Sequence, residues 1–255
     1  MITRNGFLTA AVSAVALLAY SNTASAVPIN YGDFIGNTVD FIQVTEDSGT
    51  DTTPLYGAPT VSGDALDFNP VSFNSSSTGA GGVNITDGTL TLMMMAQAGN
   101  FIDAIEFDEA GDFTLAGLAG TAFASVTANF LLDIQEVDGV GITPIDISTA
   151  MVFTPSNGDF DLIADGPGPL VDGAWSGFLM VDITQALIDN NIPFVNGATK
   201  VSVTFDNTLT TLSQNGTSAF IAKKDVGGVG ITVVPEPASL ALLTLGALAM
   251  MGRRR

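Results

Sequence analysis

The sequence predicts an all-β protein: a β-sandwich or jelly-roll ectodomain with one short helix, flanked by an N-terminal signal peptide and a C-terminal single transmembrane helix. Apolar and polar residues alternate along much of the chain, as in residues 38–46 (TVDFIQVTE), which is the pattern of half-buried strands. Turns containing glycine or acidic residues recur roughly every eight to twelve residues without intervening helices, which favours a sandwich. Each end of the chain carries one short apolar segment.

The alternating segments place the expected strands. They cover residues 30–36, 38–46, 62–68, 88–98, 102–108, 112–118, 122–137, 142–153, 175–183, 200–206, 219–223 and 230–234. Long loops are expected at 47–59, 73–82 and 159–175, where Asp, Gly, Ser, Thr and Pro gather and favour turns. One short helix is expected over residues 185–190, because Asp182 or Thr184 can cap its start and Pro193 stops it.

Residues 1–26 have the layout of a signal peptide. Arg4 supplies the positive charge, residues 7–19 are apolar, and Ala24-Ser25-Ala26 form a small-x-small site, so signal peptidase is expected to cut after Ala26. The apolar run of about 13 residues is too short for a transmembrane helix, which needs roughly 20. Export through the Sec translocon is therefore expected.

Residues 27–233 are long enough for one domain with a sizeable hydrophobic core. The chain contains no cysteine, so stability has to come from packing and hydrogen bonds and not from disulfides. All but one of the 26 acidic residues of the chain lie in this domain, together with three lysines and no arginine. Nucleic-acid binding is excluded, because phosphate recognition needs a positive surface.

The C-terminal segment 234–255 has three parts in a fixed order. Val234-Pro235-Glu236-Pro237 is held extended by its prolines, and an uncharged apolar run follows over residues 238–252. At about 15 residues this run is a short membrane span, since roughly 20 residues cross the hydrocarbon layer. Arg253, Arg254 and Arg255 follow it, where the positive-inside rule keeps them in the cytoplasm.

This arrangement resembles the PEP-CTERM sorting signal of Gram-negative bacteria. The resemblance covers residues 234–255, with Pro235-Glu236-Pro237, the apolar helix and the arginine cluster all present. It implies recognition and processing by an exosortase, a transient inner-membrane intermediate, and delivery to the cell surface or the extracellular matrix in connection with exopolysaccharide and biofilm. An ordinary C-terminal membrane anchor is the alternative, but it would not need Pro-Glu-Pro.

Catalysis is not expected. The chain has no histidine and no cysteine, which excludes Ser-His-Asp triads and thiol nucleophiles. Glycoside hydrolysis, which needs only two carboxylates, stays open as a third function, but no pair of acidic residues lies in a recognisable motif.

Two acidic segments are candidate binding sites for Ca²⁺, which takes six to eight oxygen ligands. The candidate ligands are Glu106 and Asp108 in one segment and Asp159, Asp161 and Asp165 in the other. Neither segment fits an EF-hand loop. The alternative is that both are acidic turns on a solvated edge, where charge discourages pairing with other sheets. No other cofactor is expected.

Two functional classes therefore remain. The first is a non-catalytic surface or matrix protein whose β domain is exported and sorted by its C-terminal signal. The second is a carbohydrate-binding module that holds exopolysaccharide, with Trp175, Tyr31 and Tyr56 as candidate platforms for sugar rings and calcium as a possible aid.

Overall fold

The computed structural model describes residues 27–70, 72–118, 120–166, 168–224 and 229–235. Fifteen strands form one hydrogen-bonded network. They are β1 (Ile29–Ile35), β2 (Val39–Asp47), β3 (Thr60–Ser62), β4 (Ala65–Phe68), β5 (Asn74–Thr78), β6 (Gly82–Ala96), β7 (Ile102–Gly117), β8 (Ala122–Val137), β9 (Val140–Ala150), β10 (Val152–Thr154), β11 (Asp159–Asp161), β12 (Leu170–Asp182), β13 (Ala198–Ser213), β14 (Thr217–Lys223) and β15 (Val229–Pro235). The helical segments among them are α1 (Ile183–Asp189) and a single 3₁₀ turn, η1 (Ser156–Gly158).

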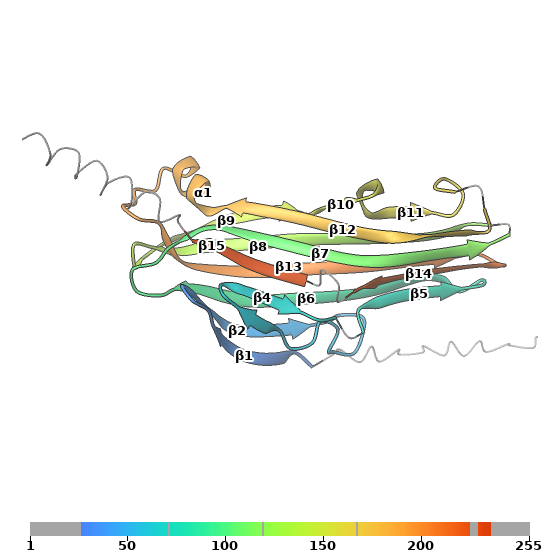
Figure 1. The fold of residues 1–255 in the computed structure, drawn as a ribbon, viewed down its shortest axis with the longest axis horizontal. Helices are drawn as coiled ribbons and strands as arrows, with labels where there is room; N and C mark the ends of the chain where they lie inside the picture. The colour runs from blue at the N-terminus through green and yellow to red at the C-terminus, as the bar shows by residue number, and fades with distance from the viewer. Residues whose placement is uncertain (1–26, 71, 119, 167, 225–228, 236–255) are drawn as a thin grey trace, which may run out of the picture.

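Two groups of strands make up this network (Figure 1). The first group runs in the order β1-β2-β6-β13-β8-β9, with all neighbours antiparallel. The second is built on β7, which pairs with β12 along one side and with β14 and then β15 along the other. One backbone pairing, between Ala198 of β13 and Ile102 of β7, connects a long strand of the first group directly to a long strand of the second. The strands β6, β7, β8 and β13 have 15 or 16 residues each, which at about 3.3 Å per residue makes each of them about 50 Å long.

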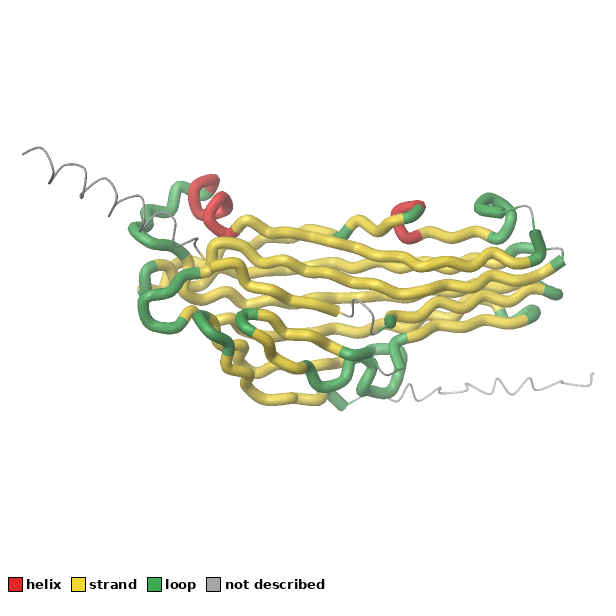
Figure 2. Tube along the Cα trace, in the orientation of Figure 1, coloured by secondary structure: helices red, strands yellow, loops and turns green. Residues whose placement is uncertain are grey.

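Both long sides of the molecule are bridged, so the sheet is nearly closed. On one side, Ser77 Oγ of β5 donates to Gly82 O of β6 at 2.7 Å, and Thr86 Oγ1 of β6 donates to Asn74 O of β5 at 2.8 Å. On the other side, β10 pairs with β12 while β11 pairs with β8. The segment β10-η1-β11 therefore spans the gap between the groups. Most loops lie at the two ends of the long strands (Figure 2).

The core lies between the two groups of strands, and its side chains come from every second residue of a strand. Along β13 the buried side chains are those of every second residue from Val201 to Ser213. The groups meet through aromatic rings: Phe107 of β7 lies with its ring centroid 6.0 Å from that of Phe205 on β13 and 4.5 Å from that of Phe130 on β8.

The prediction of a mainly β chain with one short helix is confirmed. The helix α1 begins two residues earlier than expected, and Asp182 is its cap, with Oδ1 accepting from Gln185 N at 2.7 Å. The signal peptide and the apolar C-terminal run lie outside the described residues. Within the described part of the chain, no helix is both long and apolar enough to cross a membrane.

Two expected interruptions of the sheet are wrong. The strands expected at 102–108 and 112–118 are one strand, β7. The acidic residue Glu109 between them does not form a turn, because it is buried against a lysine. The loop expected at 73–82 contains β5, whose Ser75 points inward to contact Thr211 Oγ1 at 2.9 Å.

Further expected boundaries also change. The strand expected at 200–206 runs to Ser213, and the loop expected at 159–175 contains β11 and the start of β12. In both places polar residues that favour turns are paired in the sheet, because hydrogen bonds to neighbouring strands outweigh local preference.

Several glycines in the sheet leave space for aromatic side chains of neighbouring strands. A Cβ added to Gly111 of β7 would lie 2.3 Å from the indole of Trp175 and 2.1 Å from Ala222 O. Gly88 of β6 has the same relation to Phe73, whose ring would be 2.6 Å from the added Cβ. Real Cβ contacts are not this short, so these positions need glycine because of packing.

The substitution Gly111→Ala is expected to destabilise the domain by about 1–3 kcal/mol, the usual cost of overpacking a filled core. The control is Gly141→Ala on β9, where an added Cβ has no neighbour within 4 Å and the change should stay within about 0.5 kcal/mol. Urea unfolding measures both. Equal unfolding midpoints for the two variants would contradict this account of Gly111.

Candidate functional site

The C-terminal segment begins inside the sheet. Strand β15 lies between β7 and β4, with Ile231 opposite Phe107 on one side and Leu66 on the other. Val233 is buried, and its N–H donates to Asp64 O at 2.9 Å. Pro235, the last residue of β15, lies opposite Ile102. Val234 and Pro235 of the predicted sorting motif thus belong to the fold, while the other motif residues lie outside the described part. Those are Glu236, Pro237, Arg253, Arg254 and Arg255.

A buried polar network lies between the two groups of strands. Lys223 Nζ of β14 is 2.6 Å from Glu109 Oε2 of β7 and donates to Asn207 Oδ1 of β13 at 2.8 Å. Asn207 Nδ2 donates in turn to Glu109 Oε1 at 2.6 Å. The side chains of Lys223 and Glu109 are fully inaccessible, and Asn207 is 0% exposed. The ammonium also lies 5.2 Å and 5.5 Å from the ring centroids of Phe73 and Trp175.

Burial controls the protonation of this network. Removal from water raises the pKa of Glu109 above its ordinary value and lowers the pKa of Lys223, and in each case burial outweighs the attraction between the two groups. Both directions favour the neutral forms, because a low-dielectric interior disfavours charge. The pair therefore holds a proton that can lie on either partner.

This network was not predicted from the sequence, although a signal for it exists. Lys223 continues the inward series of Ala219 and Ile221, and Glu109 continues the inward series of Ile105 and Phe107. A charged residue at an inward position of a strand is rarely buried unless it has a partner. The presence of one acid and one of only three domain lysines at such positions could have indicated a pair.

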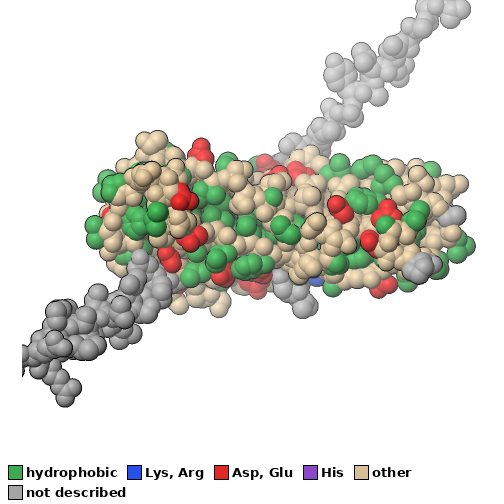
Figure 3. Space-filling model, turned by 90° about the horizontal axis from the view of Figure 1, so that it is seen from above, with side chains coloured by type: hydrophobic (Ala, Val, Ile, Leu, Met, Phe, Trp, Pro, Cys, Tyr) green, Lys and Arg blue, Asp and Glu red, His purple; other side chains and the backbone are tan. Residues whose placement is uncertain are grey.

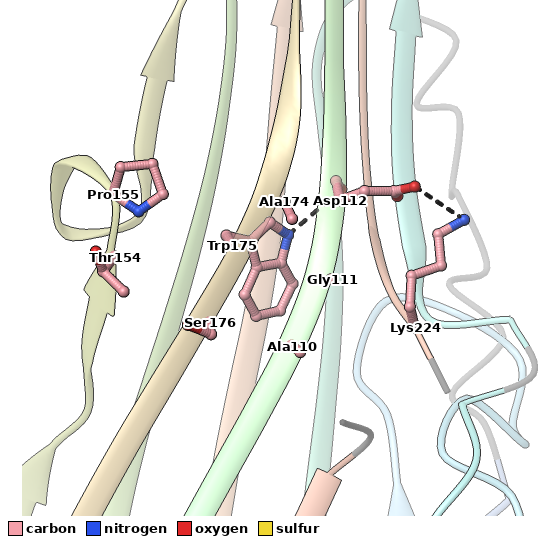
Figure 4. A pocket seen from close by; sticks show the side chains of 9 residues that line it. All are labelled: Ala110, Gly111, Asp112, Thr154, Pro155, Ala174, Trp175, Ser176 and Lys224. Carbon is pink, nitrogen blue, oxygen red and sulfur yellow. Dashed lines mark hydrogen bonds and ion pairs between the residues drawn. The ribbon is translucent and has the colours of Figure 1, made fainter. Parts of the chain in front are cut away.

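A cavity of about 740 Å³ lies next to the network. Its lining residues come from β7, β10, β12 and the end of β14 (Figure 4), and they are Ala110, Gly111, Asp112, Thr154, Pro155, Ala174, Trp175, Ser176 and Lys224. The indole lies over Gly111 and its Nε1 donates to Asp112 O at 3.3 Å. Lys224 Nζ is 3.3 Å from Asp112 Oδ2.

Of the three candidate sugar platforms, Trp175 lines the cavity, whereas Tyr31 and Tyr56 do not line it and both contact Glu46, which accepts from the Tyr31 hydroxyl and the Tyr56 N–H. Trp175 is 2% exposed, so only an edge reaches the cavity, and Tyr56 is fully buried with its hydroxyl donating to Gly88 O at 3.0 Å. Tyr31 is half-buried and donates to Glu46 Oε2 at 2.6 Å. Burial and this hydrogen bond raise the pKa of Tyr31 above its ordinary value. A stacking role for these rings stays a prediction.

The first pair of calcium candidates lies on an outward face of β7. Asp108 faces Gly230 of β15, which lies between it and Asp67 of β4 in one row across three strands. Burial, then Asp67 and then Glu106, raise the pKa of Asp108 above its ordinary value of 3.8. Asp67 is not among the predicted calcium candidates, because it comes from a distant segment of the chain.

The second set of calcium candidates forms a local turn after β11. Asp161 Oδ1 accepts from Ile163 N at 2.7 Å and Ala164 N at 2.9 Å, and Asp165 Oδ2 accepts from Asp161 N at 2.7 Å. Asp159 is exposed at the start of the strand. Among the described residues, no three acidic side chains lie close enough to hold one metal ion. Calcium binding stays a prediction.

These features define a class of protein: a slender β domain whose last strand leads directly into a C-terminal sorting segment. Residues 233–255 match the family model of the PEP-CTERM protein-sorting motif, which confirms the resemblance. The motif implies export, sorting to the cell surface and an exosortase as the processing partner. A comparison with curated proteins finds no relative of the chain.

The substitution Asp108→Asn is expected to change the pH dependence of stability. The carboxyl of Asp108 binds its proton more tightly in the folded chain than in the unfolded chain. The protonated carboxyl therefore adds to the free energy of unfolding below the ordinary pKa of 3.8, and this addition is lost as the pH rises through the raised pKa of the folded chain. The variant should therefore be slightly more stable than the parent at pH 7, by less than about 1 kcal/mol at this half-exposed site, and should gain less on acidification.

Thermal unfolding between pH 7 and pH 4 measures this difference. Asp172→Asn, at an exposed position of β12, removes the same charge and serves as the control. If both variants follow the same curve, the row formed by Asp67 and Asp108 does not perturb Asp108.

Proposed function

We propose that this protein is an exported, non-catalytic β-domain protein, a β-sandwich with bridged sides, that an exosortase sorts and processes at Pro235-Glu236-Pro237. It leaves the cytoplasm by the Sec route, loses residues 1–26, passes through an inner-membrane intermediate and reaches the cell surface or the extracellular matrix. The observation that carries the proposal is the sorting motif at 233–255.

The physical character of the domain supports this destination. Acidic side chains occur at several separate places along the face seen in Figure 3 and do not gather in one hollow. Such a surface keeps a protein soluble and repels anionic partners. The pairing of β10 with β12 and of β11 with β8 covers part of the strand edges on one side, which lowers the tendency to aggregate outside the cell. Neither property needs a disulfide.

The lining of the cavity supports a non-catalytic role. Asp112 is the one carboxylate among its lining residues, and Lys224 is paired with it. Two carboxylates facing a cleft are the minimum for glycoside hydrolysis. The hydrolase is therefore the least favoured of the three functions.

The sorting proposal predicts that Glu236→Ala, or removal of Arg253–Arg255, leaves the domain folded but unprocessed. The greater part of each variant should remain in the inner-membrane fraction, because the enzyme loses its recognition element or the helix loses its cytoplasmic anchor. Cell fractionation with mass analysis of the C-terminus measures this. Glu136→Ala, a substitution in β8 of an acid that pairs with Lys200, is the control. Normal processing of both tail variants would refute the proposal.

Binding of exopolysaccharide is the second candidate function, favoured by the cavity beside Trp175. The tryptophan edge and the hydroxyls of Thr154 and Ser176 are groups that contact sugars. Ala174→Leu should fill the cavity and weaken retention on the polysaccharide at least tenfold, about 1.4 kcal/mol, whereas Ala150→Leu at an exposed position of β9 should have no effect.

A polysaccharide pull-down with neutral and acidic polymers measures this retention, and repeating it with calcium or with a chelator tests assistance by the metal. No retention on any polymer leaves the structural role alone.

A further inference from the structure

We propose that Lys223 and Asn207 react with each other in the folded domain and form an intramolecular amide cross-link, with Glu109 as the proton-transfer group. Lys223 carries the nucleophile, Asn207 the carboxamide that it attacks, and Glu109 contacts both. The inference is independent of the sorting proposal, since it concerns only residues inside the domain.

The distances place the reacting groups in contact. Lys223 Nζ is 2.8 Å from Asn207 Oδ1, and a carbonyl bond is about 1.23 Å long, so Nζ lies within about 4 Å of the carbon Cγ that it would attack. Reacting atoms held about 3–3.5 Å apart are in a near-attack arrangement. A small rotation of the lysine side chain would bring Nζ to that distance.

Glu109 contacts both the attacking nitrogen and the leaving nitrogen. Its Oε2 is 2.6 Å from the nitrogen of Lys223, and its Oε1 accepts a hydrogen bond at 2.6 Å from Asn207 Nδ2, the nitrogen that has to leave. One carboxyl group can therefore take a proton from the nucleophile and deliver one to the leaving group. This is the geometry required of a general base that becomes a general acid.

Burial prepares the reactive protonation states. An ammonium ion has no lone pair, so Lys223 has to lose a proton before it can attack. The lowered pKa of Lys223 and the raised pKa of Glu109, both caused by burial, reduce the free-energy cost of moving that proton to the carboxylate, whose Oε2 is 2.6 Å from the nitrogen. The product is a neutral amine beside a neutral carboxylic acid.

The steps balance without any further reactant. The amine of Lys223 attacks Cγ of Asn207, and the new N–C bond forms as the carbonyl becomes tetrahedral. The acid proton of Glu109 passes to Nδ2, the Cγ–Nδ2 bond breaks, and Glu109 takes back a proton from the nitrogen of Lys223. Ammonia leaves, a secondary amide remains between the two side chains, and no atom is oxidised or reduced.

The surroundings exclude the competing reaction with water. Lys223, Glu109 and Asn207 are each buried. The ring centroids of Phe73 and Trp175 lie 5.2 Å and 5.5 Å from the lysine nitrogen. Removing water prevents hydrolysis of the carboxamide and strengthens each electrostatic contact. The bond would join β13 of the first group of strands to β14 of the second, a covalent tie in a chain without cysteine.

Mass analysis of the purified full chain tests the proposal. Trypsin should release the segment that contains both Asn207 and Lys223 lighter by one ammonia than its sequence requires. Chymotrypsin can cut between the two residues, at Leu209, Leu212 and Phe220, and should then release two peptides joined through a side chain. The loss of ammonia should be absent from Lys223→Met and from Glu109→Gln.

Lys224→Met is the matched control, because it removes the neighbouring lysine, which pairs with Asp112 at the surface, and should keep the loss. A parent protein of full mass, with separate chymotryptic peptides, would overturn the proposal. Loss of ammonia that persists in Lys223→Met, together with separate chymotryptic peptides in the parent, would also overturn it, because Asn207 or Asn215, which precedes Gly216, would then have cyclised with its own backbone. Where a variant does not fold, the parent peptides still decide.

Discussion

The interior of the domain depends on the buried contact of Lys223 with Glu109, because ionisable groups taken out of water destabilise a fold unless all their partners are in place. Asn207 supplies the missing partner by donating to the acid and accepting from the lysine. The three residues come from β14, β7 and β13, so their contacts fix the two groups of strands relative to each other in distance and register. Loss of one charge would leave the other unpaired, at a cost of about 3–5 kcal/mol.

The rest of the core adapts to a narrow space between long strands. Aromatic rings fill it, and where a ring lies against a neighbouring strand the chain has a glycine, as in the pairs of Trp175 with Gly111 and Phe73 with Gly88. At the end of the molecule near β5, hydroxyl groups replace the rings, and Ser77 contacts Ser213 at 2.6 Å. Polar groups are tolerated there because each has a hydrogen-bond partner.

The sequence was sufficient for the mainly β character of the chain, for the short helix with Asp182 as one of two cap candidates, and for the sorting motif, because these depend on local patterns. It was insufficient where a distant residue decides the outcome. Glu109 looks like a turn residue until its lysine is placed beside it, and Ser75 looks like part of a loop until Thr211 lies opposite. Trp175 was expected to face a ligand, whereas a glycine on the neighbouring strand allows it to pack inward.

The position of β15 has a mechanical consequence. A chain attached through Pro235 transmits any pull directly to a strand that is paired on both sides, with β7 and with β4. The pull acts along the strand, so the hydrogen bonds of both ladders are loaded together in shear and do not open one after another. Both ladders therefore contribute to the resistance of the attachment point to force.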